Sequence, residues 1–122
     1  IDQMISYIKS HNDVDYVCMD KSMILEGTGS EIFTSKSLNK SIEMSNHEMD
    51  KEHVTQYLIN NSLFKKEYLK PNNIEFLSKK PYFLSIDNFN DYVRNVNLLE
   101  KYSSKNTLKK IIYKINNNEK IL

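Results

Sequence analysis

The chain has 122 residues, of which 39% are hydrophobic and 27% charged, and its formal net charge is +1. This length fits one domain with one ordinary core, and apolar residues spread along the whole chain exclude intrinsic disorder. No apolar run reaches the roughly 18 residues of a membrane span, and the first residues lack a signal-peptide pattern, so we expect a cytoplasmic protein without a membrane partner. Cys18 is the single cysteine, which excludes an internal disulfide and argues against a structural zinc site.

Apolar spacing predicts a helix and then a strand at the start of the chain. Met4, Ile5 and Ile8 follow helical spacing, and the pattern stops in a polar turn at residues 11–13. Residues 15–19 form a compact apolar run of strand length, so we expect a buried strand there. Helix, turn and strand at this spacing are half of a βαβ unit, which favours an α/β fold with a mostly parallel sheet.

Both glycines of the chain, Gly27 and Gly29, precede a short extended piece at residues 31–33. Each glycine can adopt a positive φ and permit a close backbone approach. Two glycines without a third and without a P-loop lysine are a weak phosphate-loop signal. An ordinary turn is therefore the favoured interpretation.

Two helices are expected in the middle of the chain. Ser35 can cap the first, whose apolar positions include Leu38 and Ile42, and Asp50 can cap the second, which directs Leu58 inward. The second helix is expected to end at residues 60–61.

Glu52 and His53 fall in the first turn of that second helix. They can act there as a dipole-favoured acid and an N3 side chain, which is the simpler interpretation, or face a site at the edge of the sheet. His47 and His53 are six residues apart instead of four, so we expect no zinc site shared between them.

The second half begins with short extended segments. Strands or extended connections are expected at residues 64–69 and 74–77, around a turn at residues 71–73, and a further strand is expected at residues 81–86. Two helices follow, each marked by apolar residues at helical spacing. Their apolar positions are Phe89, Tyr92, Val93, Val96 and Leu99 in the first helix and Leu108, Ile111, Ile112 and Ile115 in the second.

Asp87 lies where the strand at residues 81–86 ends and a helix begins, which is where open α/β sheets place ligands. A carboxylate at this place can hold Mg²⁺ against phosphate oxygens. The competing interpretation makes Asp87 or Asn88 the N-cap of the helix, with Asp91 completing a capping box if Asn88 is the cap. Spacing alone favours the cap.

Charge is distributed unevenly along the chain. Residues 1–61 carry 5 Lys against 10 Asp and Glu, whereas residues 62–122 carry 12 Lys and Arg against 6 Asp and Glu. The basic residues occur as dispersed pairs, which usually only solvate a face. Aromatic residues do not alternate with them as a base-stacking platform would require, so we expect no nucleic-acid partner.

Three segments, in this order, resemble one family. They are GTGSEIF at residues 27–33, KEHVTQY at residues 51–57 and LSIDNFNDY at residues 84–92. Together they look like the carboxy-terminal half of the spore coat polysaccharide biosynthesis cytidylyltransferases, relatives of the acylneuraminate and ketodeoxyoctonate cytidylyltransferases. The family segments read G-x-x-x-E-V-F, R-E-H-V-T-P-Y and [LV]-[ST]-[VI]-D-x-x-E-D-[LFY]. The resemblance covers roughly residues 1–115, and its most specific match is E-H-V-T.

The resemblance implies that residues 1–122 are the carboxy-terminal portion of a single nucleotidyltransferase domain, with a three-layer αβα, Rossmann-like nucleotide-diphospho-sugar transferase fold. The implied enzyme transfers CMP from CTP to a sugar or sugar acid for surface polysaccharide biosynthesis. Asp87 matches the family's Mg²⁺-holding aspartate, which makes it the implied catalytic and metal-binding residue. The implied substrate-binding residues are Glu31, Lys51, Glu52 and His53.

The sequence also departs from the family. The basic, glycine-rich nucleotide loop and the first metal-binding aspartate have no counterpart here, and Lys51, Gln56 and Asn90 replace Arg, Pro and Glu. We therefore expect a missing amino-terminal half, no activity of this chain alone, and either a fragment of a longer chain or a decayed gene. A homodimer is one possible oligomeric state. The alternative function is a non-catalytic binding or assembly module that uses the basic second half and the apolar stripe at residues 111–115.

Overall fold

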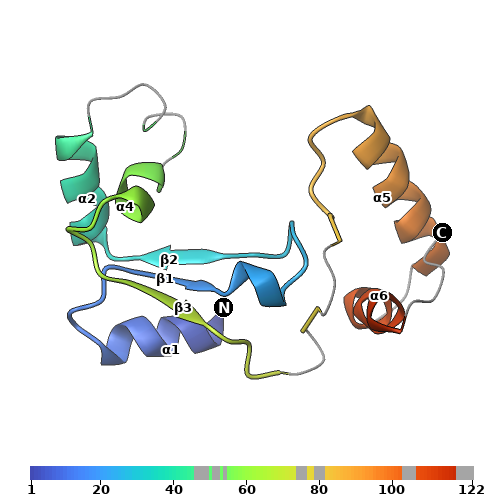
Figure 1. Cartoon of the computed structure of the whole chain (residues 1–122), viewed down its shortest axis with the longest axis horizontal. Coiled ribbons are helices and arrows are strands. Elements are labelled where there is room, and N and C mark those ends of the chain that lie inside the picture. The colour runs from blue at the N-terminus through green and yellow to red at the C-terminus, as the bar shows by residue number, and fades with distance from the viewer. Residues whose placement is uncertain are drawn as a thin grey trace. The chain divides into compact units, whose positions relative to one another are not determined.

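The computed structural model describes residues 1–45, 50, 53, 55–73, 77–78, 82–102 and 107–117. By their internal contacts the residues divide into two compact units (Figure 1). Unit 1 contains Ile1–Met19 and Ser30–Leu69, and unit 2 contains Asp20–Gly29 and Lys70–Leu122. The expectation of one nucleotidyltransferase domain stays a prediction, and each unit is described by itself.

A three-stranded mixed sheet forms the centre of unit 1. Its middle strand, β1 (Tyr16–Met19), pairs antiparallel with β2 (Glu31–Phe33) and parallel with β3 (Lys66–Leu69). The expectation of a mostly parallel sheet is therefore wrong. The connection from β1 to β2 contains only the 3₁₀ turn η1 (Lys21–Met23), and a strand that returns without a crossover helix pairs antiparallel.

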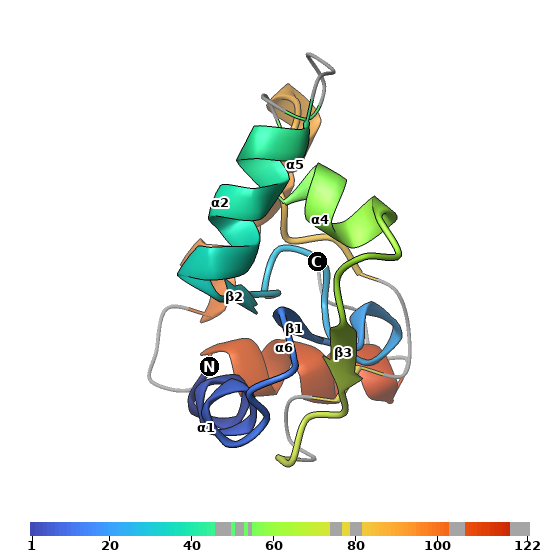
Figure 2. The ribbon, with the colours of Figure 1, turned by 90° about the vertical axis from the view of Figure 1, so that its left-hand side faces the viewer.

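Helices cover both faces of this sheet (Figures 1 and 2). Helix α1 (Asp2–Ser10) lies on one face, and helices α2 (Ser35–Met44) and α4 (Gln56–Asn60) lie on the other. Helices are needed on both faces of the sheet because β1 carries buried apolar side chains on both of its sides. The predicted α/β fold class is therefore confirmed, as a small mixed sheet with helices on both faces.

The predicted buried strand at residues 15–19 is β1, and its side chains alternate between two cores. Tyr16 and Cys18 pack in the cluster that contains Leu58 of α4, while Val17 packs in the cluster that contains Met4 of α1. Burial on both faces explains why the strand reads as a continuous apolar run without polar alternation.

Helix α2 differs from its expected form in its cap and its inward face. Thr34 is the N-cap, with its Oγ1 accepting from the Ser37 N–H at 3.0 Å, and Ser35 is the first helical residue. The buried residues are Ser37 and Ser41, of which Ser37 donates its Oγ hydrogen to the Asp15 carbonyl at 3.0 Å, while Ile42 is 61% exposed. A hydrogen-bonded serine thus takes the place that the apolar spacing assigned to a larger side chain.

Helix α4 begins later than expected. Its N-cap is Thr55 and its first residue is Gln56, so Asp50 is not its cap and His53 precedes the helix. Leu58 is fully buried, as predicted. The stretch between Asp50 and Thr55 is described only at His53, and the expected first turn with Glu52 lies outside the described residues.

Unit 2 is organised around helices α5 (Phe89–Tyr102) and α6 (Thr107–Asn116). Its buried core consists of Leu25, Leu98, Ile111, Ile112 and Ile115. Helix α6 therefore directs its predicted apolar residues inward. The stripe at residues 111–115 is part of this core, so the suggestion that it contacts a partner is wrong.

Helix α5 is rotated relative to the stripe that the sequence predicts. It buries Asn95 and Leu98, while Phe89 is 76% exposed and Leu99 is 60% exposed. The rotation follows from the amide of Asn95, which donates to two backbone carbonyls of the preceding segment. A buried polar group that is fully hydrogen-bonded can displace an apolar one from an inward face.

The strand predicted at residues 81–86 is reduced to one bridge in its described part. Phe83 pairs in parallel with Glu26, and the Leu84 N–H donates to the Glu26 carbonyl at 2.9 Å. Beyond this point the carbonyls of Leu84 and Ser85 accept from side chains of α5 instead of a neighbouring strand. The ladder consequently stops after a single residue.

Candidate functional site

The residues that the sequence singles out belong to different units. Glu31 and His53 lie in unit 1 and Asp87 lies in unit 2. Lys51 and Glu52 lie outside the described residues.

Glu31 is held by the Thr55 hydroxyl on the sheet face that α4 covers. It pairs with Cys18 across the β1–β2 ladder, so its side chain shares a face with Tyr16 and Cys18. The Thr55 hydroxyl donates to Glu31 Oε2 at 2.7 Å. Burial first, and then the neighbouring Cys18 and Glu31 side chains, raise the pKa of Tyr16, which keeps its hydroxyl protonated.

This network ties two of the three sequence segments together. Thr55 uses its hydroxyl on Glu31 and makes no side-chain cap bond to α4. The His53 carbonyl accepts from the Gln56 N–H at 2.8 Å, so the backbone around His53 is fixed immediately next to Thr55. The His53 side chain is exposed. Glu31 therefore positions the segment that carries His53, and the sequence signal for Thr55 was its place in E-H-V-T.

A double-mutant cycle tests this network. We expect Glu31→Ala and Thr55→Val each to lower the free energy of unfolding, and the pair to show a coupling energy of about 1 kcal/mol, because each change removes the same hydrogen bond. The measurement is urea unfolding of the four proteins. Thr28→Val is a matched control, since the Thr28 hydroxyl donates to the Leu25 carbonyl and should show no coupling to Glu31. Additive effects of Glu31→Ala and Thr55→Val would contradict the assignment.

In unit 2, Gly27 packs directly against the segment that leads to Asp87. Its φ is +88°, and a Cβ at this position would lie 2.7 Å from the Ser85 nitrogen and 2.8 Å from the Leu84 carbonyl carbon. Gly29 has neither feature, because its added Cβ would meet only the Ile24 side chain, at 3.5 Å. Gly27 is therefore more than an ordinary turn glycine. It lets two of the three sequence segments approach at backbone distance.

The start of α5 settles which residue caps it. Asn88 Oδ1 accepts from the Asp91 N–H at 3.1 Å, and Asp91 Oδ2 accepts in return from the Asp87 N–H at 3.2 Å. Asn88 is thus the capping side chain, with Asp91 as its partner. In the part of the chain that the structure describes, the Asp87 carboxylate takes no part in the cap and is exposed.

Arg94 and Asn95 fix the backbone before Asp87. Arg94 donates to Asp91 Oδ1 at 2.7 Å and to the Ser85 carbonyl at 3.3 Å, and the Asn95 amide donates to the carbonyls of Leu84 and Ser85. The hydrogen bond from the Asp87 N–H, followed by the Arg94 guanidinium, lowers the pKa of Asp91. Asp91 therefore stays ionised at neutral pH and remains paired with Arg94.

Neither Arg94 nor Asn95 was singled out from the sequence. A signal existed for the first, because Arg94 is the chain's single arginine among many lysines, and only a guanidinium presents a planar fork of donors. No signal existed for Asn95, which the apolar spacing placed on the polar side of α5.

The described residues contain no group of three or more His, Cys, Asp or Glu side chains arranged to hold a metal ion. Asp91 is engaged by Arg94, which leaves Asp87 as a single exposed carboxylate at the start of α5. Because Mg²⁺ is commonly held by one or two carboxylates together with substrate phosphates and water, Asp87 fits as one ligand and not as a complete site.

None of the helices in the described ranges combines the length and the apolarity that crossing a bilayer requires.

Comparison with known proteins identifies the fold. No protein-family model matches the sequence. The structure is similar to that of a cytidylyltransferase from Leptospira borgpetersenii serovar Hardjo-bovis, with a TM-score of 0.73 at 19% sequence identity, over 96% of this chain and 49% of that one. The chain therefore has a cytidylyltransferase-like α/β fold, and it spans about half the length of that enzyme.

A relative at the sequence level is an uncharacterized protein of Methanocaldococcus jannaschii. It is 38% identical over 93 residues, which are 75% of this chain and 36% of that protein. The chain thus spans about a third of that relative's length.

Proposed function

We propose that this chain is the carboxy-terminal part of a cytidylyltransferase that transfers CMP from CTP to a sugar or sugar acid, within a three-layer nucleotide-diphospho-sugar transferase fold. The observation that carries the proposal is the structural match, because nearly the whole chain superposes on half of a cytidylyltransferase. The order of the three sequence segments supports it independently. Surface polysaccharide biosynthesis, as in the family that the segments resemble, is the proposed context, and the cytoplasm is the proposed location.

In the proposed reaction an oxygen of the sugar attacks the α-phosphorus of CTP in line, the bond to the β-phosphate oxygen breaks, and pyrophosphate leaves. Transfer of this kind needs charge neutralisation and positioning more than it needs covalent help from the protein. When bound, Mg²⁺ would supply that neutralisation, and Asp87 would supply one of its carboxylate ligands. Asp91 accepts from the Asp87 N–H, and Arg94 and Asn95 hold the carbonyls of the two residues Leu84 and Ser85 before it.

Glu31, Lys51, Glu52 and His53 are the proposed sugar-recognition residues. The Glu31 carboxylate already accepts from the Thr55 hydroxyl, so we assign it the positioning of the His53 segment in addition to any contact with the sugar. His53 is exposed and thus accessible to a substrate.

The proposed partners follow from what the chain does not contain. The sequence has no counterpart of the family's nucleotide loop, so the proposal requires an amino-terminal half to bind CTP. A homodimer is compatible with the proposal and not required by it.

The experiment that tests the proposed function compares two proteins. The first is the chain extended upstream through the open reading frame before the codon for Ile1, and the second is residues 1–122 alone. With Mg²⁺, CTP and a panel of sugar acids, we expect pyrophosphate release from the extended protein only. We also expect CTP to leave the melting temperature of residues 1–122 unchanged, because ligands that do not bind the native state do not stabilise it.

Two outcomes would contradict the proposal. A stop codon immediately upstream of Ile1, together with a stable monomeric chain, would favour the alternative function, a non-catalytic binding or assembly module. A CTP-dependent rise in the melting temperature of residues 1–122 that requires Mg²⁺ would show that this chain carries the nucleotide site itself.

A non-catalytic assembly module is the second candidate function. The observation that favours it is the outward side of α5, where Phe89 and Tyr92 stack with ring centroids 6.3 Å apart and are 76% and 53% exposed. A contiguous exposed apolar patch can mark a protein–protein interaction site.

A further inference from the structure

Helix α6 has two faces of different chemistry. Ile111, Ile112 and Ile115 pack in the core of unit 2 with Leu25 and Leu98. Burial of these isoleucines fixes the rotation of the helix. The remaining surface of α6 carries Lys109, Lys110, Tyr113 and Lys114.

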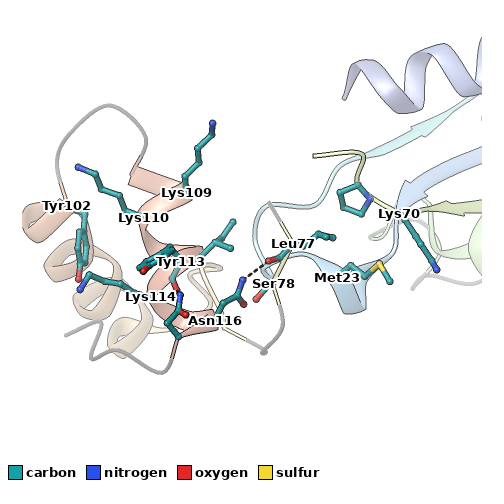
Figure 3. Close-up of a pocket in the computed structure, with 13 residues that line it drawn as sticks. Met23, Lys70, Leu77, Ser78, Tyr102, Lys109, Lys110, Tyr113, Lys114 and Asn116 are labelled. Carbon is teal, nitrogen blue, oxygen red and sulfur yellow. Dashed lines mark hydrogen bonds between the residues drawn. The ribbon is translucent and has the colours of Figure 1, made fainter. Parts of the chain in front are cut away.

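This lysine and tyrosine surface borders a pocket of about 910 Å³ (Figure 3). Every described residue that lines the pocket belongs to unit 2. Met23, Leu77 and Ile112 supply apolar lining, and Tyr102 and Tyr113 supply aromatic lining. The volume lies in the range of sites for small organic molecules, about 300–1,000 Å³.

The walls of the pocket are held by specific contacts. The Asn116 amide donates to the Leu77 carbonyl at 2.9 Å, which joins α6 to the segment across the pocket, and the Ser78 N–H donates to the Met23 carbonyl at 2.9 Å. The Lys114 ammonium lies 6.0 Å from the centre of the Tyr102 ring. The pocket is therefore built by side chains with defined partners.

The charged side chains among the described lining residues are all lysines. Four lysines, Lys70, Lys109, Lys110 and Lys114, border the pocket, and no carboxylate is found among its described lining residues. Figure 3 shows Lys109 and Lys110 extending from one stretch of α6. An apolar pocket bordered by ammonium groups complements a ligand with an apolar body and an anionic group.

We propose that this pocket binds a phosphate monoester that carries an aromatic or aliphatic body. The phosphate dianion matches several lysines, and the organic body matches the apolar and tyrosine lining. The proposal does not rest on the proposed CMP transfer, because Glu31, His53 and Asp87 are not among the lining residues.

The test uses 4-methylumbelliferyl phosphate as the probe and isothermal titration calorimetry of residues 1–122 as the measurement. We expect this probe to bind at least about tenfold more tightly than either 4-methylumbelliferone, which lacks the phosphate, or inorganic phosphate, which lacks the organic body. Equal affinity for the probe and for either of its parts would overturn the proposal, as would the absence of binding.

Variants localise the site. Lys109→Gln combined with Lys114→Gln is expected to weaken probe binding at least about tenfold, and Lys110→Gln alone, whose side chain is exposed, about threefold. The matched control is Lys9→Gln combined with Lys36→Gln, which makes the same change of charge at exposed positions of unit 1. A melting temperature within a degree or so of the parent chain shows that each variant is folded. An equal loss of probe affinity in the control would show that the weaker binding comes from the lower net charge of the chain and not from the pocket lysines. This result would contradict the proposal.

Discussion

Replacing Asp87 by Asn is expected to lower the turnover of the proposed CMP transfer about 100-fold or more while leaving the melting temperature nearly unchanged. The amide has the size of the carboxylate but lacks the charge that a Mg²⁺ ligand needs. Stability should be preserved because Asn88, and not Asp87, caps α5, and the Asp87 backbone N–H that bonds Asp91 is untouched. The measurements are pyrophosphate release by the extended protein and thermal unfolding.

Asn88→Ala is the matched control for this prediction. It removes the oxygen that accepts from the Asp91 N–H, so we expect a loss of about 1 kcal/mol in the free energy of unfolding and little change in turnover. The two neighbouring positions thus separate the metal-binding role from the capping role. A loss of stability with unchanged turnover in Asp87→Asn would leave Asp87 with a structural role only.

Replacing Gly27 by Ala is expected to destabilise unit 2 by about 3 kcal/mol. A non-glycine residue at positive φ costs about 1–3 kcal/mol by itself. The added Cβ would also lie 2.7 Å from the Ser85 nitrogen, a backbone atom that cannot rotate away. The measurement is the free energy of unfolding from urea titration, and the expected shift is well beyond its error.

Gly29→Ala controls for the loss of a glycine in the same loop. Gly29 has no positive φ, and its added Cβ would meet only the Ile24 side chain at 3.5 Å, so its replacement should change the free energy of unfolding by less than about 1 kcal/mol. Equal effects of the two substitutions would show that the close approach of Gly27 to the segment before Asp87 is unimportant. In the extended protein, Gly27→Ala should also reduce turnover, because that segment leads to Asp87.

Apolar patterning along the chain was sufficient to predict several elements. The buried strand at residues 15–19 and the apolar face of α6 were confirmed because each rests on several large apolar side chains, whose burial outweighs any single polar contact. The order of the three segments was likewise a property of the sequence alone, and it pointed to the fold that the structural match supports.

Other features were decided only by tertiary contacts. The inward faces of α2 and α5 depend on Ser37 and Asn95, whose buried polar groups donate to backbone carbonyls outside their own helices. The spacing of apolar residues predicts which face of a helix is apolar. It cannot predict that a polar side chain finds a hydrogen-bond partner and is buried instead. The antiparallel direction of β2 follows from a connection without a crossover helix, and the choice of Asn88 over Asp87 as the cap was settled by the bond that Asn88 Oδ1 accepts from the Asp91 N–H.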